Sequence, residues 1–252
     1  MSGVDDVGVV ISANAVLPAN REAIRLRTAD GLVLVGELAT PVEGPITATI
    51  ICVHPLPTHG GMMDSHVLRK MAWRLPAMAG IAVLRFNTRG TTSAAGTSEG
   101  TFANGDAEGF DLDAAIDHVV QRALPDPWAL GWSFGTDVVL RHGNRDPVVG
   151  GILLSPPLRT STEQDLRAWR ESGRPLVCIV PEFDDYLPAE PARQRFGTIP
   201  QARVIVIADG QHLWVGERFV GQVLDQIVSA VVPSHGPLPT TWSGPMTRWS
   251  DL

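Results

Sequence analysis

Three side chains in this 252-residue chain have the types and the order that nucleophilic catalysis requires. Ser133 stands in the segment Gly131-Trp132-Ser133-Phe134-Gly135, and Asp184 and His212 follow it 51 and 79 residues later. A serine hydroxyl becomes a good nucleophile when a histidine removes its proton and a carboxylate orients that histidine. The three residues therefore predict acyl transfer through a covalent intermediate, provided that the fold brings them together.

The two glycines around Ser133 favour a sharp turn between a strand and a helix. A serine at such a turn has strained backbone, and side chains two positions away on either side would collide. Glycine has no Cβ atom, so the strand and the helix can close up. In a chain with 25 glycines the same pattern also fits an ordinary turn whose serine caps a helix. The neighbouring elements must decide between the two interpretations.

Apolar segments along the chain alternate between strand and helix patterns. An antiparallel hairpin is expected first, with a turn at Asp30-Gly31, and βα units follow it. This order predicts the α/β class, with one open, mostly parallel sheet and helices on both faces. The expected strands cover 24–28, 32–38, 47–53, 81–86, 127–130, 148–154, 175–180 and 202–207, and the expected helices begin near 65, 106, 134, 162 and 219.

The candidate catalytic residues each follow one of these strands. Asp184 comes shortly after the strand that ends at Val180, and His212 comes after the strand that ends at Ile207. Because ligands of parallel sheets bind at the carboxyl ends of the strands, we expect both residues to meet Ser133 there. Asp185 is adjacent to Asp184, so the residues alone leave the choice of carboxylate open.

The chain is long enough for one large domain, which we place at residues 23–232. Residues 1–22 are predicted to form an N-terminal arm, and residues 233–252 an irregular tail whose two tryptophans, Trp242 and Trp249, suggest that it docks. Only about 20 residues separate the strands that end at Leu154 and begin near Leu176, which is too short for a lid domain.

Charge and composition narrow the classes of partner. The net charge is −7, from 20 basic and 27 acidic residues, and no run of Lys or Arg occurs. This balance argues against binding to nucleic acid or to an anionic membrane. The first residues are acidic where a signal peptide is basic, and Cys52 and Cys178 lie in predicted buried strands. We therefore expect a cytoplasmic protein.

Further motifs accompany the serine in a fixed order. They are His54-Pro55-Leu56-Pro57 followed by Gly60-Gly61, then Arg85-Phe86-Asn87-Thr88-Arg89-Gly90, and Ser155-Pro156-Pro157 after the next strand. Over residues 24–232 the chain resembles the α/β-hydrolase superfamily, and within it the compact, capless serine hydrolases of the dienelactone-hydrolase-like or small-esterase type. It departs from the family where Thr91-Thr92 replaces a frequent second glycine.

The resemblance implies a role for each site residue. Ser133 would be the nucleophile, His212 the general base and acid, and Asp184, favoured over Asp185 by the family's Asp-Asp-x-x-Pro pattern, the residue that orients His212. The backbone N–H groups of Phe134 and Leu56 would form the oxyanion hole. The implied reaction is hydrolysis of a small-molecule ester, thioester or lactone, without a cofactor or a metal.

The substrate contacts are less defined by the sequence. Trp132, Met62, Tyr186 and Trp214 are expected to give the rim of the site an apolar lining, together with Phe134 and Leu56, although Trp132 and Phe134 fit core positions equally well. An uncapped site favours small or extended soluble esters over buried lipid chains. His54 is interpreted as a structural residue. His59, Asp64 and His66 match no established metal-ligand spacing, so no metal site is predicted.

Two alternatives to ester hydrolysis remain open at this point. The chain could be a non-catalytic scaffold of the same fold that binds a small molecule or a protein, because a fold does not determine a function. The same triad could also transfer the acyl group to an acceptor other than water, as an acyltransferase or a perhydrolase does. The sequence leaves the oligomeric state and the natural substrate undetermined.

Overall fold

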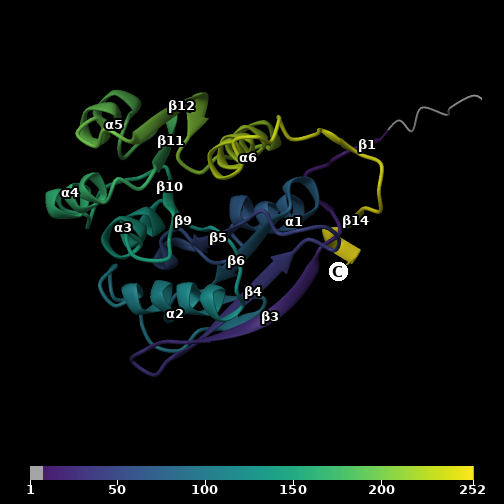
Figure 1. Ribbon diagram of the computed structural model, residues 1–252, viewed down its shortest axis with the longest axis horizontal. Helices are drawn as coiled ribbons and strands as arrows, with labels where there is room; N and C mark the ends of the chain where they lie inside the picture. Colours follow the sequence, from purple (N-terminus) through teal and green to yellow (C-terminus); the bar gives the residue numbers. More distant parts are fainter. Residues whose placement is uncertain (1–7, 252) are drawn as a thin grey trace, which may run out of the picture.

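The computed structural model describes residues 8–251, and its centre is an eight-stranded sheet in the order β12-β11-β10-β9-β5-β6-β4-β3 (Figure 1). The antiparallel part joins β3, β4 and β6, and the remaining neighbours pair in parallel. The strands are β3 (Asn20–Arg27), β4 (Val33–Thr40), β5 (Ala48–Val53), β6 (Ile81–Phe86), β9 (Pro127–Trp132), β10 (Gly150–Leu154), β11 (Leu176–Phe183) and β12 (Ala202–Gln211).

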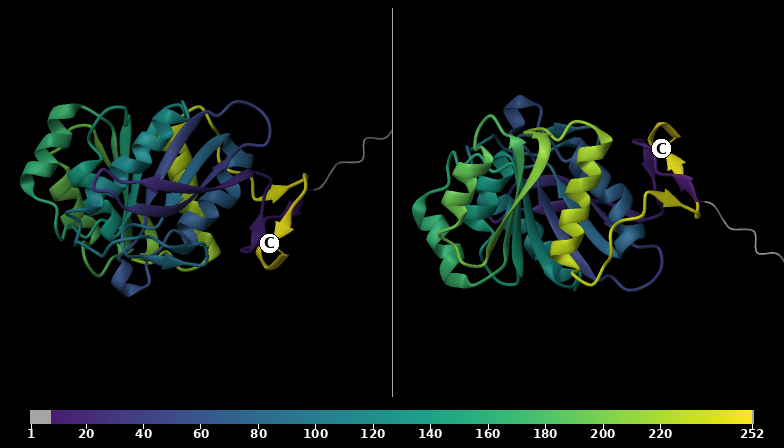
Figure 2. Two further views of the ribbon diagram at one scale, coloured as in Figure 1. Left: turned by 90° about the horizontal axis from the view of Figure 1, so that it is seen from below. Right: turned by 90° about the horizontal axis from the view of Figure 1, so that it is seen from above.

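Helices cover both faces of the sheet, as Figures 1 and 2 show. One apolar cluster packs α2 (Glu108–Gln121), α3 (Phe134–His142), α4 (Glu163–Ser172) and α5 (Ala189–Phe196) against one face. A second cluster packs α1 (His66–Ala79) and α6 (Glu217–Val231) against the other face. The predicted fold class, an open and mostly parallel α/β sheet opened by an antiparallel hairpin, is confirmed.

The central strands are buried from end to end, which explains their apolar sequences. Every residue of β5, β6, β9 and β10 is buried, as expected for strands covered by helices on both faces. Cys52 and Cys178 are free thiols within this core. Burial raises the pKa of the Cys52 thiol to about 12, so this cysteine is an inert core residue.

The structure shows three features that the sequence expectations do not include. Helix α5 was not predicted, because it buries only Ala192 and Phe196 and is otherwise polar. Val120 of α2 is apolar but 53% exposed, since it follows the buried Val119 by one position and lies off the apolar side of the helix. The polar segment 87–105 contains a short hairpin of β7 (Thr92–Ser93) and β8 (Gly96–Thr97).

The N-terminal arm and the C-terminal tail lie side by side (Figures 1 and 2). Strand β1 (Val9–Val10) pairs with β13 (Thr241–Trp242), and β2 (Ala15–Val16) pairs with β14 (Thr247–Arg248) ahead of the short helix η2 (Trp249–Asp251). The Arg69 guanidinium lies over the rings of Trp73 and Trp249, at 4.8 and 5.0 Å. The tail is thus docked on α1. Residues 1–7 of the predicted arm and Leu252 of the tail lie outside the described residues.

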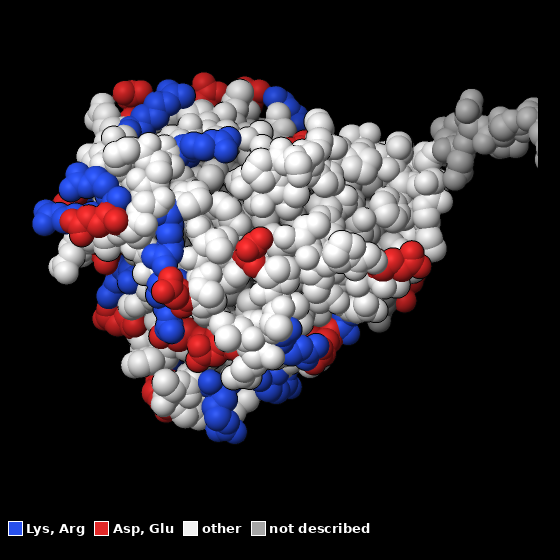
Figure 3. Space-filling model, viewed as in Figure 1, with Lys and Arg blue, Asp and Glu red and all other residues white. Residues whose placement is uncertain are grey.

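Charged side chains on the face drawn in Figure 3 gather over the end of the molecule that carries α4 and α5 and along its lower edge. Basic and acidic residues are interspersed there, and few lie over the middle of this face or toward the tail. Among the helices between residues 8 and 251, none has both the length and the apolar character needed to cross a bilayer.

Candidate active site

Ser133 occupies a strained turn between β9 and α3. Its backbone has φ 51° and ψ −119°, in the region that non-glycine residues rarely adopt. A Cβ atom on Gly131 would lie 2.2 Å from the carbonyl oxygen of Gly135, so only glycine fits at that position. The Ser133 N–H donates to the Leu154 carbonyl at 2.8 Å, which fixes the turn to the end of β10.

Gly135 is required for a different reason from the one expected. The sequence suggested that side chains at positions 131 and 135 would collide with each other. Instead, a Cβ atom on Gly135 would lie 2.2 Å from the Val53 carbonyl oxygen and 2.9 Å from that of His54. The first turn of α3 therefore lies directly against the end of β5, and the loop that follows β5 begins beside the serine.

The structure brings Ser133, His212 and Asp184 into one chain of hydrogen bonds. The distance from Ser133 Oγ to His212 Nε2 is 2.8 Å, and that from His212 Nδ1 to Asp184 Oδ2 is 2.9 Å. Because a carboxylate only accepts, Nδ1 carries the proton and Nε2 is left free to accept from the serine hydroxyl. His212 and Asp184 are 7% and 5% exposed, and Ser133 is half-buried.

The loop around Asp184 distinguishes it from its neighbour. The second carboxylate oxygen of Asp184 accepts the backbone N–H groups of Tyr186 and Leu187 at 2.8 and 3.2 Å. Asp185 is exposed and takes no part in the chain of hydrogen bonds. Of the two adjacent carboxylates, Asp184 is thus the one that contacts the imidazole.

A residue to which the sequence assigned no role holds the histidine loop. Ser155 follows β10, is fully buried and has φ 49°. Its hydroxyl donates to the His212 carbonyl at 3.0 Å, and the indole N–H of Trp132 donates to the same oxygen at 3.3 Å. Two donors from neighbouring strands therefore fix the backbone of His212. The sequence signal was the Ser155-Pro156-Pro157 motif, which marked the position without revealing the contact.

Two backbone N–H groups in the segments that follow β5 and β9, those of Leu56 and Phe134, have no protein acceptor within residues 8–251. Phe134 begins α3, whose first N–H groups have no partner within the helix. Leu56 lies in a tight loop, because its carbonyl accepts from Gly61 at 3.0 Å and a Cβ atom on Gly61 would lie 2.0 Å from the Pro55 oxygen.

His54 supports this loop from within the core. Its Nε2 accepts the Thr88 N–H at 3.0 Å, so its Nδ1 carries a proton and donates to the Pro55 carbonyl at 2.7 Å. The His54 ring is completely buried, as expected for a structural residue. Burial lowers the pKa of His54 from its ordinary value of 6.5 to about 4, so the imidazole is neutral in the folded protein at pH 7.

This burial predicts a pH-dependent stability. The unfolded chain binds a proton at His54 below about pH 6.5 and the folded protein only near pH 4, so stability falls as the pH decreases through this window. The loss amounts to about 3 kcal/mol. We expect urea unfolding at pH 7 and pH 4 to show a smaller loss for His54→Gln than for the wild type. Equal losses in the two proteins would contradict the prediction.

The Arg85-to-Gly90 motif acts as a scaffold for the loops around the site. Arg85 donates to the carboxylates of Asp64 and Glu37 at 2.8 and 2.7 Å, so Asp64 is engaged in an ion pair. The Asn87 side-chain oxygen accepts the Met63 N–H at 2.9 Å. Together these contacts fix residues 63–64, which follow the loop of Leu56.

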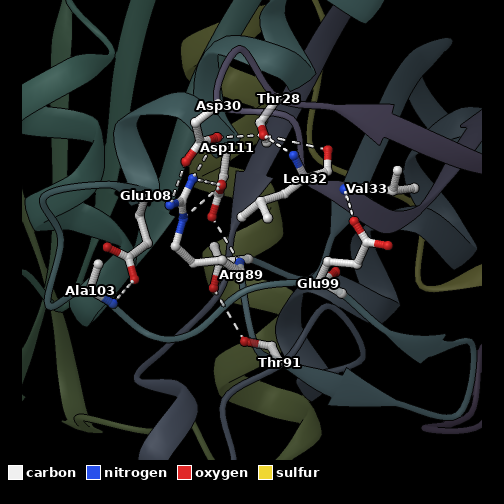
Figure 4. A network of polar contacts seen from close by, with 12 residues as sticks. Thr28, Asp30, Leu32, Val33, Arg89, Thr91, Glu99, Ala103, Glu108 and Asp111 are labelled. Atoms are coloured by element: carbon white, nitrogen blue, oxygen red, sulfur yellow. Dashed lines mark hydrogen bonds and ion pairs between the residues drawn. The ribbon is translucent and has the colours of Figure 1, made fainter.

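Arg89 forms the centre of the network in Figure 4. Its guanidinium contacts the fully buried Asp111 at 2.8 and 3.1 Å and Asp30 at 2.9 Å, and its N–H donates to Asp111 at 2.8 Å. Burial raises the pKa of the Asp111 carboxyl, and the hydrogen bonds from Arg89 act in the opposite direction. This ion pair joins the β3–β4 turn and α2 to the segment that begins after β6.

The expected apolar rim is only partly present. The prediction that Trp132 and Trp214 line it is wrong, because they are 2% and 0% exposed. Trp214 has φ 53°, and its side chain packs in the core with α6, whereas the adjacent Leu213 and Val215 are 53% and 68% exposed. Tyr186 is 50% exposed, and its ring lies 4.5 Å from the His212 ring.

Met62 lines a cavity of about 340 Å³, together with residues of the loop that follows Leu56. The ring of Phe102, in its wall, packs against Phe134 with the ring centres 5.3 Å apart, so the cavity borders the start of α3, directly after Ser133. None of its lining residues is charged; they are Pro57, Thr58, Gly60, Gly61, Met62, Gly90, Thr91, Thr92 and Phe102. The two threonines that depart from the family pattern thus form part of this wall.

Solved structures similar to this chain carry serine hydrolase and esterase descriptions. A protein of Xanthomonas campestris, described as an α/β serine hydrolase without a lid, is 26% identical, covers 88% of this chain and 99% of its own, and has a TM-score of 0.70. An α/β serine hydrolase homologue of Coxiella burnetii is 23% identical, with coverages of 87% and 99% and a TM-score of 0.70. The Pyrococcus furiosus esterase Pf2001 is 19% identical, with coverages of 84% and 93% and a TM-score of 0.66.

No protein-family model matches the chain, and no curated protein matches its sequence. The solved structures nevertheless match nearly the whole sheet and its helices. Between β10 and β11 the chain holds only α4, as in a protein without a lid. These likenesses support hydrolase activity at the general level. The chain thus has the α/β-hydrolase fold, in a compact form similar to that of serine hydrolases without a lid.

Proposed function

We propose that this protein is a serine hydrolase that cleaves a carboxylic ester, thioester or lactone through an acyl-enzyme intermediate. The observation that carries the proposal is the hydrogen-bonded chain from Ser133 through His212 to Asp184, at a strained turn beside a helix N-terminus. Each group has the donor or acceptor state that its role requires, since Nε2 of His212 is free to accept the serine proton.

The reaction would proceed in two halves. His212 removes the proton of Ser133 as Oγ attacks the substrate carbonyl, and Asp184 stabilises the imidazolium that forms. His212 then donates the proton to the leaving oxygen, and the acyl group stays on Ser133. In the second half, His212 activates a water molecule that attacks the acyl-enzyme, and the serine is released.

The free N–H groups of Phe134 and Leu56 would stabilise the oxyanion of each tetrahedral intermediate. Both belong to backbone that is held rigidly, the first by the α3 helix and the second by the tight loop to Gly61. Donors that are already oriented need no rearrangement as negative charge develops. Removal of one such donor typically costs about 3 kcal/mol of transition-state stabilisation.

An open site favours water as the acceptor. The half-buried serine has no lid over it, and the segment between β10 and β11 is too short to supply one. Acyl transfer to another nucleophile uses the same three residues and is the second candidate. A non-catalytic scaffold is disfavoured, because the strained turn and the complete hydrogen-bonded chain have no evident use in binding alone.

The test is a series of 4-nitrophenyl esters with acyl chains from C2 to C16, hydrolysed with and without methanol. We expect turnover that is fastest for the short chains, because an uncapped site does not enclose a long chain. A steady rise to C16 would contradict the open-site interpretation, and a dominant methyl ester product would favour acyl transfer. No turnover of any ester by the folded protein would contradict the proposed function.

A further inference from the structure

Arg159 lies between the two catalytic loops. In the sheet, β10 is the neighbour of β9 on one side and of β11 on the other, so the loop after β10 lies between those of Ser133 and Asp184. Arg159 belongs to this loop and is exposed. Its guanidinium lies 4.8 Å from the centre of the Tyr186 ring, and that ring lies 4.5 Å from the ring of His212. A cation is therefore held at the mouth of the site.

The loop that contains Arg159 is fixed to α3, the helix that begins directly after Ser133. Asp137, on the first turn of α3, is 1% exposed, and its carboxylate accepts the N–H groups of Arg159, Thr160 and Ser161 at 3.2, 3.3 and 2.9 Å. It also accepts the Ser161 hydroxyl. Leu158 adopts φ 50°, which turns the chain just before Arg159. The backbone that carries the cation thus has a defined position relative to Ser133.

Arg159 has no acidic side-chain partner within the part of the chain that the structure describes. Ion pairs there engage many of the other arginines, but none includes Arg159. The exposed Asp185, next to Tyr186, is not paired with it either. In a protein of net charge −7, this leaves a positively charged group available beside the triad.

The proton transfer determines which part of a substrate meets this cation. His212 donates its proton to the leaving oxygen, so the alcohol part of an ester must lie beside His212 and therefore beside Tyr186 and Arg159. A guanidinium pairs with a carboxylate through two parallel hydrogen bonds. We infer that Arg159 binds a carboxylate on the alcohol part of the ester. The preferred substrates are then hydroxy acids whose hydroxyl group is acylated and whose carboxylate is free. The inference rests on the proposed serine hydrolase function.

The test compares 4-acetoxybenzoate with its neutral methyl ester, since the two share the acetyl group and differ in charge on the leaving group. The ratio of their kcat/KM values is measured for the wild type, Arg159→Gln, Arg159→Lys and Arg167→Gln. Comparing ratios between variants removes the intrinsic difference in reactivity of the two esters. Arg167 on α4 is a matched control, because it is an exposed arginine that forms no ion pair with any residue between 8 and 251.

We expect Arg159→Gln to lower the ratio of charged to neutral ester about tenfold, as loss of one charge-assisted contact does. Arg159→Lys should restore part of it and Arg167→Gln should leave it unchanged. Added salt should lower the wild-type ratio, because the site is open to solvent. A ratio in Arg159→Gln equal to that of the wild type would overturn the inference.

Labelling with a fluorophosphonate separates the two ways in which the experiment can fail. A wild-type protein that is labelled once but shows no dependence of the ratio on Arg159 contradicts this inference and leaves the proposed function intact. A folded wild-type protein that is not labelled contradicts both. A preference for a carboxylate on the acyl part, measured with monophenyl succinate against phenyl butyrate, would overturn the placement beside His212.

Discussion

Ser133→Ala is expected to lower kcat for ester hydrolysis by about 10⁴- to 10⁶-fold, the range seen when the nucleophile of a serine triad is removed. The Ser133 hydroxyl is hydrogen-bonded to His212 at 2.8 Å, and its oxygen would form the bond to the acyl group, for which alanine offers no substitute. The residual rate would come from substrate binding and from the Phe134 and Leu56 N–H donors.

The same substitution should eliminate covalent labelling. Intact mass after treatment with a fluorophosphonate should show one adduct on the wild type and none on Ser133→Ala. Ser229→Ala is a suitable control, because Ser229 is an exposed residue of α6, on a helix that carries none of the site residues. The fold should persist in Ser133→Ala, because alanine keeps the backbone and removes only the hydroxyl. Labelling that survives in Ser133→Ala would place the reactive serine elsewhere.

The sequence was sufficient for the sheet and for the relative placement of Ser133, Asp184 and His212. Ser133 and Asp184 follow β9 and β11, whose apolar residues are buried, and His212 follows the edge strand β12, which keeps an apolar run although it is only partly buried. Such apolar runs are easy to recognise in a sequence. Once the strands are parallel, their carboxyl ends must share an edge, so the residues after them must converge. This reasoning uses only the order of elements, which a sequence contains in full.

Which side chains contact one another within those loops depends on the backbone geometry, and the sequence pattern does not reveal this geometry. Trp214 was expected at the rim, but its positive φ turns the side chain into the core. Ser155 reaches the His212 carbonyl only because β9, β10 and the His212 loop meet at one end of the sheet. Arg159 meets Tyr186 through two loops that are 27 residues apart in the chain. Such contacts follow from the register and twist of the sheet, which neither composition nor spacing determines.

The motif from Arg85 to Gly90 indicated a family resemblance and not the contacts that its residues form. In the structure, Arg85 and Asn87 fix residues 63–64, and Arg89 joins Asp30 to Asp111. Each is a long-range contact with a partner that lies at least 21 residues away. The motif thus marks a scaffold that holds residues 63–64 behind the Leu56 loop, and its role became visible only with the partners in place.

The second large effect on activity is expected from a substitution of Asp184, and the adjacent Asp185 provides the comparison. We expect Asp184→Asn to lower kcat/KM by about 10⁴-fold, because the asparagine amide can donate to Nδ1 and so favour the tautomer whose Nε2 holds a proton. In that tautomer His212 cannot accept the proton of Ser133. Asp185→Asn should change kcat/KM by no more than about threefold, since an exposed carboxylate outside the hydrogen-bonded chain contributes little.

The Asp184→Asn and Asp185→Asn variants make the same chemical change one position apart, so comparing them tests the geometry of the loop directly. Asp184 also accepts the N–H groups of Tyr186 and Leu187, and thermal unfolding of both variants shows whether a rate loss reflects a disturbed loop. Asparagine keeps one oxygen that can accept these bonds, which limits the expected loss of stability. Rates of fluorophosphonate labelling should follow the rates of hydrolysis, because both require activation of Ser133. A large loss in Asp185→Asn with little change in Asp184→Asn would reverse the assignment of the acid and, with it, the orientation of His212.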